Sequence, residues 1–325
     1  MLCDVVKSIE CYPEIGMLSD INEVSQCVGG CVPNTAIDLA KIDGRVKISA
    51  IGKVGNDDYG RYIINHLEKH GINCSGVSIS KTKQTSFSDV MSMPSGERTF
   101  FHFRGANTEF SSHDIDVDKL SCDIFHIGYL LLLDLFDQGD PEYGTVMARF
   151  LHSLQCKGIK TSIDAVSSST LSFEKIIKPA IKYCDYVILN EIECCNIWSI
   201  SPYKDGALDI EAIKKAMFLT MNEGTSEKVI VHCKAAGFCL DKSGEFTIVP
   251  SLNIPKSHIK GSVGAGDAFC AACLYAIYSG YTDVQMLEFA SGAAACNLFC
   301  ENSIDGMLTK DGIYETIKKY KRREL

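Results

Sequence analysis

The chain has 325 residues, of which 46% are hydrophobic and 22% are charged, and its formal net charge is −9. This length accommodates one large α/β domain with a small accessory part, and the composition is ordinary for a soluble globular protein. The acidic balance argues against a nucleic-acid partner, because such a partner requires a basic surface.

The sixteen cysteines follow neither a disulfide framework nor a zinc-site spacing. Cys270, Cys273 and Cys296 stand inside apolar runs, so we expect cysteine to act as a small hydrophobic residue in a reducing compartment. The longest apolar run, 127–136, is too short to span a bilayer, and charged residues interrupt the N-terminal stretch. We therefore expect a cytoplasmic protein with no membrane partner.

Residues 1–7 have the pattern of the end of a strand that carries Asp4. Only three residues precede this aspartate, whereas a full strand needs about five or six, so we expect most of this first strand to be missing. Residues 8–28 alternate loosely between apolar and polar and are broken by proline and glycine, which predicts short strands and turns.

Gly29, Gly30 and Asn34 introduce the first helix. Paired glycines allow a ligand to approach the backbone, and Asn34 is a suitable N-cap, although the same pattern also fits an ordinary strand-to-helix turn. A strand at 46–51 then leads through a glycine-containing turn into an amphipathic helix, for which Asp57 is the expected N-cap.

Three short strands are expected between residues 78 and 103, with a turn at 94–98. Arg104 and Asn107 follow directly after the last of them. Farther along, apolar strand patterns alternate with helical ones, which predicts a parallel sheet with helices on both faces. The strands are expected at 124–127, 160–164, 186–189 and 228–232.

Polar residues stand where these strands end, and ligands of parallel sheets bind beyond those ends. Asp164 ends one strand, and the motif Asn190-x-x-Glu193 follows the next. The stretch Gly261-Ser-Val-Gly264-Ala-Gly-Asp267 then runs into a strong helix. A glycine-rich loop at a helix N-terminus directs unpaired N–H groups at one point, which makes it a candidate anion site.

These motifs, in this order, resemble the signatures of the PfkB (ribokinase-like) family of carbohydrate and nucleoside kinases, and the resemblance covers essentially the whole chain. It implies a ribokinase-like three-layer α/β/α domain with a mainly parallel central sheet and a small β-structured lid. Residues 1–325 would form a single kinase unit, with the lid at about 8–28 and 78–108 and the α/β core in the remainder.

The resemblance further implies transfer of the γ-phosphate of ATP to a hydroxyl of a small carbohydrate, with ATP and Mg²⁺ as cofactors. Asp267 would be the general base, and the backbone of Gly264, Ala265 and Gly266 would be the anion hole. The implied substrate-binding residues are Asp4, Gly29, Gly30, Asn34, Arg104 and Asn107. The implied nucleotide-binding residues are Asn190, Glu193, Lys234, Gly237 and Ser262, of which Glu193 would hold the metal through water.

The chain departs from the family pattern at three positions. Gly261 stands where relatives usually have Asp or Asn, and Lys234 stands where a glycine usually lines the nucleotide, which leaves the phosphate donor open. Cys31 replaces the lysine of ribokinases, and Gly128-Tyr129 offers no acidic partner there, so ribose is disfavoured. Arg104 would select an anionic or strongly polar substituent, or alternatively brace the lid in a salt bridge.

Other functions remain open at this point. A nucleoside kinase of the same family is one alternative, and a sugar-binding protein of this fold without turnover is another. A P-loop kinase is disfavoured because Gly139 to Thr145 lacks the lysine, and no dinucleotide-binding Gly-x-Gly-x-x-Gly follows an early strand. A homodimer formed through the lid is compatible with the resemblance.

Overall fold

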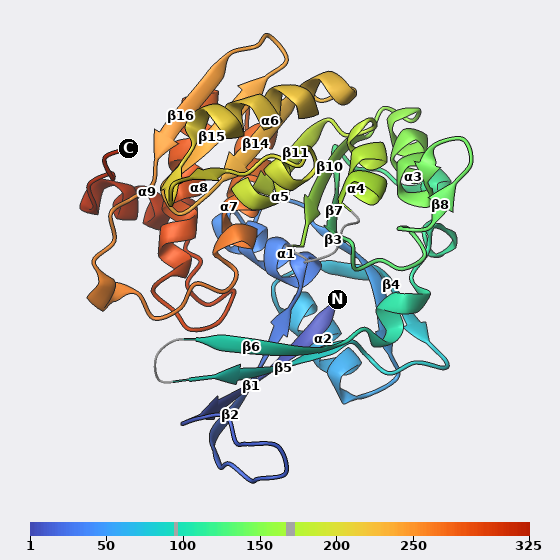
Figure 1. Ribbon diagram of the computed structural model, residues 1–325. Coiled ribbons are helices and arrows are strands. Elements are labelled where there is room, and N and C mark those ends of the chain that lie inside the picture. Colours follow the sequence, from blue (N-terminus) through green and yellow to red (C-terminus); the bar gives the residue numbers. More distant parts are fainter. Residues whose placement is uncertain (94–96, 167–172) are drawn as a thin grey trace.

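A six-stranded sheet forms the centre of the computed structural model, which describes residues 1–93, 97–166 and 173–325 (Figure 1). The strand order is β16-β15-β14-β11-β10-β7. Its strands are β7 (Ile124–Leu130), β10 (Lys160–Ala165), β11 (Tyr186–Asn190), β14 (Lys228–His232), β15 (Ala236–Asp241) and β16 (Phe246–Pro250). β7, β10, β11 and β14 are mutually parallel, which confirms the four predicted strands and the mainly parallel sheet. β15 runs antiparallel to β14, and β16 runs antiparallel to β15.

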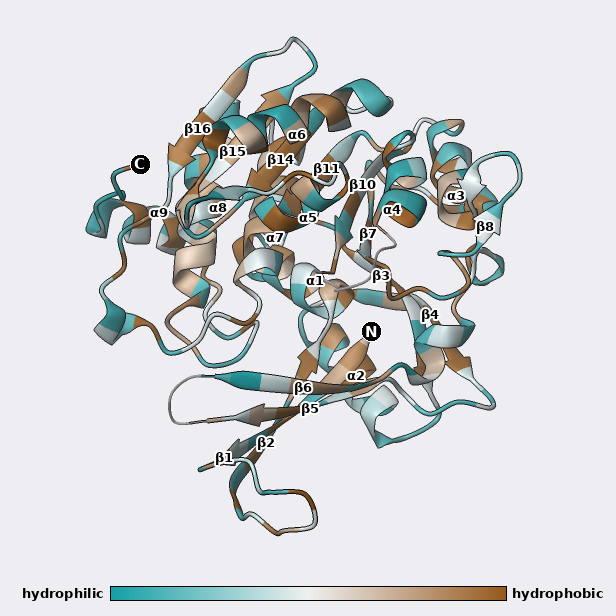
Figure 2. Ribbon diagram, in the orientation of Figure 1, coloured by the Kyte–Doolittle hydropathy of each residue, from teal (hydrophilic) through white to brown (hydrophobic). Residues whose placement is uncertain are grey.

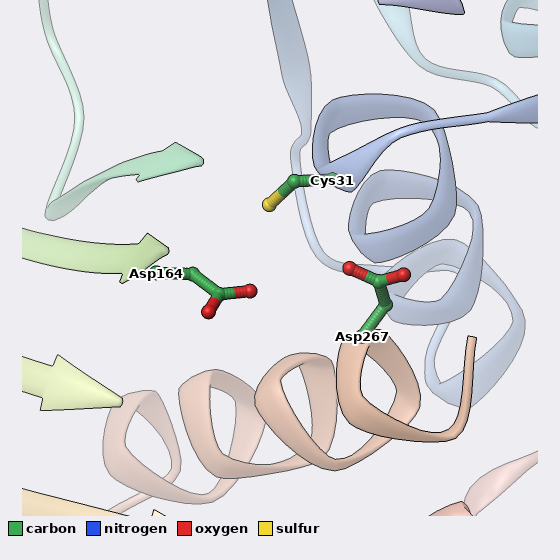
Figure 3. A group of neighbouring side chains, drawn as sticks. All are labelled: Cys31, Asp164 and Asp267. Atoms are coloured by element: carbon green, nitrogen blue, oxygen red, sulfur yellow. The ribbon is translucent and has the colours of Figure 1, made fainter. Parts of the chain in front are cut away.

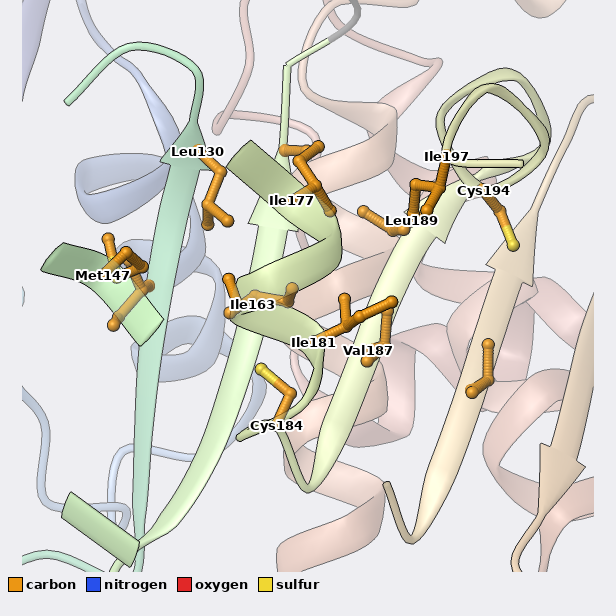
Figure 4. Close-up of a cluster of buried hydrophobic side chains, with 14 of the residues drawn as sticks. Leu130, Met147, Ile163, Ile177, Ile181, Cys184, Val187, Leu189, Cys194 and Ile197 are labelled. Carbon is orange, nitrogen blue, oxygen red and sulfur yellow. The ribbon is translucent and has the colours of Figure 1, made fainter. Parts of the chain in front are cut away.

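Helices cover both faces of this sheet because its strands are apolar on both sides. Val187 and Leu189 of β11 point to one face, and Ile188 between them points to the other. The first face, shown in part in Figure 4, packs against α3 (Val146–Gln155), α4 (Phe173–Ile181), α5 (Glu191–Asn196) and α6 (Ile210–Glu223). The second packs against α7 (Ala265–Tyr278), α8 (Asp283–Asn297) and α9 (Lys310–Lys319).

A four-stranded lid sheet lies to one side of this core, at the bottom of Figure 1. In the order β2-β1-β5-β6 it contains β2 (Ile21–Gly29), β1 (Leu2–Ile9), β5 (Phe87–Ser92) and β6 (Arg98–Phe103). Figure 2 shows hydrophobic residues on the loop that joins β1 and β2, where Ile15, Met17 and Leu18 are strongly exposed. The turn predicted at 94–98 falls partly on residues 94–96, which lie outside the described residues.

The expectation of a short stretch ahead of Asp4 is confirmed, since only Leu2 and Cys3 of β1 precede it, but the expectation that residues 1–7 form only the end of a strand is wrong. β1 is a full strand of eight residues, and Asp4 stands near its start. The strand extends this far because it is paired along both edges, antiparallel to β2 and parallel to β5. The lid sheet therefore begins at Leu2 and not near residue 8.

A separate parallel pair, β3 (Ser49–Gly55) and β4 (Asn73–Ser80), lies beside the lid. Residues 78–80, predicted within the lid, belong to β4. α2 (Asp58–Lys69) connects the pair, and the predicted cap is confirmed, since the Asp57 side chain accepts a hydrogen bond from Gly60 N. Over the described ranges, β3 and β7 are not hydrogen-bonded to each other, and no strand between them pairs with both. The sheet position between β3 and β7 is therefore thinly filled.

α1 (Cys31–Ile42) connects the lid to the core (Figure 1). Its N-cap is Gly30 at φ +83°, so the prediction of Asn34 as the cap is wrong: the helix begins one turn earlier and Asn34 lies inside it. Gly30 has the backbone freedom that this conformation requires. In the described part of the chain, no helix has the length and apolar character needed to cross a membrane.

Minor elements complete the chain. The short strand pairs are β8 (Gly139–Asp140) with β9 (Gly144–Thr145) and β12 (Tyr203–Lys204) with β13 (Ala207–Leu208). The 3-10 turns are η1 (Gly105–Glu109), η2 (Ser112–Asp114), η3 (Val117–Lys119) and η4 (Lys256–His258).

Candidate active site

The glycine loop ends at Gly264, whose left-handed backbone conformation turns the chain into the first turn of α7. Gly264 is the N-cap at φ +78°, and a Cβ there would lie 2.5 Å from the Cβ of Ser303, so only glycine fits. The first N–H groups of a helix have no partner within the helix and carry the positive end of its dipole. Ala265 and Gly266 occupy these positions, and Gly266 lies against the ring of His232. The loop thus has the geometry of an anion site.

Asp267 stands in the first turn of α7, and its side chain does not cap the helix. Its Oδ2 accepts a hydrogen bond of 2.9 Å from Asn34 Nδ2, and its Oδ1 accepts one of 2.7 Å from the Tyr129 hydroxyl. The residue is 6% exposed, and burial raises the pKa of its carboxyl while the two donors oppose that rise. A carboxylate with a raised pKa is a stronger proton acceptor than an exposed one.

The amide of Asn34 is itself fixed by a second contact. Ser303 Oγ donates a hydrogen bond of 2.9 Å to Asn34 Oδ1, which leaves the Asn34 NH₂ group directed at Asp267. Asn34 is 3% exposed, so this orientation is held inside the protein. Three elements that are distant in sequence therefore orient one carboxylate.

A second carboxylate lies close to Asp267. Asp164 is the penultimate residue of β10, next to the predicted strand end, and is 8% exposed. Donor atoms of Cys31, Asp164 and Asp267 all lie within 4.8 Å of one another, with the side chains directed toward a common space (Figure 3). Burial, together with the nearby charges of Glu193 and Asp267, raises the pKa of Asp164 well above its ordinary value. Carboxylate oxygens are suitable ligands for Mg²⁺, whose charge would relieve this repulsion.

Asn190 and Glu193 form a capping box at the start of α5. Asn190 Oδ1 accepts from Glu193 N at 2.8 Å, and Glu193 Oε2 accepts from Asn190 N at 3.0 Å. The motif therefore has a clear structural role, since a capping box satisfies two unpaired helix N–H groups. Its place beyond the C-terminal end of β11 also brings the Glu193 charge close to Asp164.

Asp4 lies against the glycine pair, on the lid side of the site. A Cβ on Gly29 would stand 2.2 Å from Asp4 Oδ2, so the glycine makes room for this carboxylate. Burial raises the pKa of Asp4 to about 6. A pocket of about 20 Å³, lined by Asp4, Arg98, Val263 and Ser303 among others, separates the lid from the glycine loop. That volume holds about one water molecule.

The two predicted lid residues contact protein groups in this conformation. Arg104 forms an ion pair with Asp134, and both side chains are partly exposed. Asn107 Oδ1 accepts a hydrogen bond of 3.2 Å from the Met1 ammonium group. Their expected contact with substrate stays a prediction, and the ion pair corresponds to the alternative in which Arg104 braces the lid.

The predicted nucleotide residues are spread along the edge of the sheet. Lys234 is exposed in the turn between β14 and β15, and Ser262 is exposed in the glycine loop. Gly237 is buried in β15, where a Cβ would press on Phe269 and Leu287. Close packing against α7 and α8 therefore accounts for this glycine.

Sequence reasoning missed three residues of the site. Tyr129, which bonds to Asp267, stands in β7 near its C-terminal end, and that position was an available signal. Ser303 lies in an irregular segment and gave none. Asp38 stands one turn after Asn34 on α1, fully buried, and neither of its oxygens has a hydrogen-bond partner among the described residues.

Comparison with known proteins finds one family along most of the chain. The family model described as pfkB family carbohydrate kinase matches residues 6–310. A 5-dehydro-2-deoxygluconokinase of Clostridium perfringens is 26% identical over 315 residues, which cover 94% of this chain and 88% of the relative. The probable fructokinase-6, chloroplastic, of Arabidopsis thaliana is 24% identical, covering 93% of this chain and 77% of the relative.

Solved structures of low sequence identity share the fold. The ribokinase of Arabidopsis thaliana complexed with ribose and ATP superposes with a TM-score of 0.78 at 19% identity, covering 97% of this chain and 96% of that one. The ribokinase of Thermotoga maritima superposes with a TM-score of 0.77 at 20% identity, with the same coverage. The predicted fold class is thereby confirmed.

Proposed function

The chain belongs to the pfkB family of carbohydrate kinases, and from this premise we propose that it transfers the γ-phosphate of ATP to a hydroxyl group of a small carbohydrate. The observation that carries the proposal is the Asp267 carboxylate, held by Asn34 and Tyr129 at the N-terminus of α7. A proton acceptor and an anion site stand next to each other there, as in-line phosphoryl transfer requires.

Each part of this site has a distinct task in the proposed reaction. Asp267 takes the proton from the attacking hydroxyl as the new O–P bond forms. The N–H groups of Ala265 and Gly266 stabilise negative charge on the phosphoryl oxygens. Asp164 and Glu193 would hold Mg²⁺, Glu193 through water, and the ion would neutralise charge on the phosphates when it is bound.

The lid residues would bind and enclose the sugar. Asp4, Gly29, Gly30 and Asn34 form one side of the proposed sugar site, and Arg104 and Asn107 follow the lid strand β6 on the other. Closure over the sugar would exclude water, which limits hydrolysis of ATP and strengthens the electrostatic interactions inside. Lys234, Gly237 and Ser262 would flank the nucleotide.

The relatives' names suggest which sugars to test first. A relative named for 5-dehydro-2-deoxygluconate and one named as a fructokinase align along nearly the whole chain. We propose a hexose or hexose-derived acid as the acceptor, since the guanidinium of Arg104 suits a carboxylate. A panel of hexoses, sugar acids, pentoses and nucleosides, assayed for ADP formation with Mg·ATP, tests this. Phosphorylation of a nucleoside and of no sugar would instead assign the alternative function, a nucleoside kinase of the same family.

A non-catalytic sugar-binding protein is distinguished by the same panel. Such a protein would show a sugar-dependent rise in melting temperature without ADP formation, because ligand binding alone stabilises the folded state. A kinase produces one ADP for each phosphorylated sugar. Failure of every acceptor, together with sugar-dependent stabilisation, would reject the kinase proposal.

We further propose that two copies associate through the lid. Ile15, Met17 and Leu18 are exposed on the loop between β1 and β2, and exposed apolar patches are often covered by a partner. Sedimentation of the wild type and of Leu18→Lys tests this. A monomer in the wild type would reject it.

A further inference from the structure

An irregular segment between α8 and α9, residues 300–304, lies directly against the glycine loop. A Cβ on Gly261 would stand 3.0 Å from the carbonyl oxygen of Glu301. A Cβ on Gly264 would stand 2.5 Å from that of Ser303. Two glycines of the loop therefore make room for this segment. The close approach also accounts for Gly261, because a larger residue there would collide with the backbone of the segment.

The same segment is fixed to α1 by two hydrogen bonds. Ser303 Oγ donates to Asn34 Oδ1 at 2.9 Å. Lys41 Nζ donates to the carbonyl oxygen of Ile304 at 2.8 Å. Ser303 is 1% exposed and Ile304 is 2% exposed, so the segment is anchored inside the protein. Since the Asn34 amide in turn donates to Asp267, the position of the segment decides how firmly that carboxylate is oriented.

Arg98 reaches this segment from the lid. It is the first residue of β6, and its Nη2 donates a hydrogen bond of 3.1 Å to the carbonyl oxygen of Glu301. Glu301 stands two residues before Ser303. A guanidinium group of the lid is thus bonded to the backbone of the segment that holds Asn34.

Asp4 and Cys27 are the titratable side chains of the lid that Arg98 faces. Burial raises the pKa of both, and the positive charge of Arg98 opposes that rise. Arg98 and Asp4 also line the small pocket between the lid and the glycine loop. Arg98 therefore has two ways to influence the site, one through Asp4 and one through residues 300–304, and they lead to different experimental results.

We propose that Arg98 is a positioning residue, whose bond to residues 300–304 couples the lid to the orientation of Asp267. The coupling passes from the guanidinium to the backbone of the segment, and then through Ser303 and Asn34 to the carboxylate. Loss of the first bond loosens the segment, so Asp267 is fully oriented only while the lid lies over the glycine loop. The kinetic part of this proposal, though not the structural part, rests on the proposed kinase function.

Hydrogen exchange tests the structural part without any activity assay. In full-length Arg98→Gln, the amides of residues 299–307 should exchange about threefold faster or more than in the wild type, because the segment has lost one of its bonds. Exchange in the middle of α7 should stay unchanged, which distinguishes a local effect from a general loss of stability. Arg98→Lys retains a donor on a long side chain and should recover part of the protection.

Lys7→Gln is the matched control for this measurement. Lys7 is also a cation of the lid, but it pairs with Asp89 inside the lid sheet, so exchange at residues 299–307 should equal that of the wild type. Equal exchange in the wild type and in Arg98→Gln would overturn the proposal, as would equal acceleration in Arg98→Gln and Lys7→Gln.

Kinetics on a sugar that the panel identifies test the link to Asp267. Arg98→Gln and Ser303→Ala should each lower kcat by about three- to tenfold and leave the KM for ATP unchanged. Each should also move the acidic limb of the kcat/KM profile to higher pH, because a loosened Asn34 amide opposes the rise in the pKa of Asp267 less well. The double variant should be no worse than the poorer single variant, since both changes break one chain of contacts.

Fully additive losses in the double variant would overturn the proposal, because Arg98 would then act through Asp4 and not through residues 300–304. A change confined to the KM for the sugar would overturn it as well. If no acceptor is phosphorylated, the kinase proposal fails, while hydrogen exchange still decides whether Arg98 holds the segment.

Discussion

The side-chain amide of Asn34 donates a hydrogen bond of 2.9 Å to the carboxylate of Asp267, and so joins α1 to α7 across 233 residues of sequence. The contact is buried, and Ser303 fixes the amide from its other side. A residue in the first turns of α1, Asn34, thus orients the carboxylate of Asp267 in the first turn of α7.

Asp267→Asn should lower kcat by about 10²–10⁴-fold, the usual effect of losing a general base. An amide has nearly the same shape, but it does not accept the proton of the sugar hydroxyl. Folding and ligand binding should be almost unchanged, which the melting temperature and the KM for ATP would report. Undiminished turnover would remove Asp267 from the mechanism.

Tyr129→Phe should shift the acidic limb of the kcat/KM profile to higher pH. The Tyr129 hydroxyl donates to Asp267 and holds down the pKa of its carboxyl, so its loss lets that pKa rise. We expect kcat to fall roughly tenfold, the cost of one charge-assisted hydrogen bond. Tyr62→Phe, which removes an exposed hydroxyl from α2, is the control and should leave the profile in place.

Gly264→Ala should disrupt the glycine loop through a steric clash. The new Cβ would stand 2.5 Å from Ser303, and relief of such a contact costs about 1–3 kcal/mol of stability. We expect kcat/KM to fall by about 10²-fold or more as the N–H groups of the loop are displaced. Gly280 has a similar positive φ, but a Cβ there would meet no atom within 4 Å. Gly280→Ala is therefore the control, because it introduces the backbone strain of an alanine at positive φ without the clash. Equal effects of the two variants would contradict the prediction.

Arg104→Lys should raise the KM for the sugar by about tenfold while leaving the KM for ATP and the melting temperature unchanged, because lysine lacks the planar fork. Asp134→Asn is the informative control, since it removes the ion partner that Arg104 has in this structure. A partly exposed ion pair contributes at most about 1 kcal/mol. A KM that is unchanged in both variants for every sugar would show that Arg104 only braces the lid.

Asp4→Asn should stabilise the protein at high pH and not at low pH. The pKa of Asp4 is raised to about 6 in the folded state, so the protonated carboxyl is favoured by folding. Wild-type stability from this group is present below about pH 4 and is lost as the pH rises through about 6. The free energy of unfolding of the variant should exceed that of the wild type by on the order of 2 kcal/mol at pH 8 and match it at pH 4. Asp58→Asn, at an exposed ion pair, should show no such difference.

The local sequence determined the four parallel strands of the central sheet and the glycine loop of the candidate site. Four apolar strand patterns predicted β7, β10, β11 and β14 because a strand that is buried on both faces is apolar at every position. The glycine loop before α7 was predictable because positive φ and close approach both require glycine. These features depend on neighbours in sequence, and so the sequence alone carries them.

Only the tertiary structure decided which distant side chains meet. The partners of Asp267 come from α1 and β7, and the serine that fixes Asn34 comes from the segment after α8. Asn34 was expected to cap its helix, yet its amide bonds to Asp267 because α1 begins one turn earlier, at Gly30. The extent of β1 was likewise underestimated, since pairing with β2 and β5 and not local propensity holds that strand. Long-range pairing of this kind leaves no periodic signal in sequence, because the geometry that creates it exists only after the elements have packed.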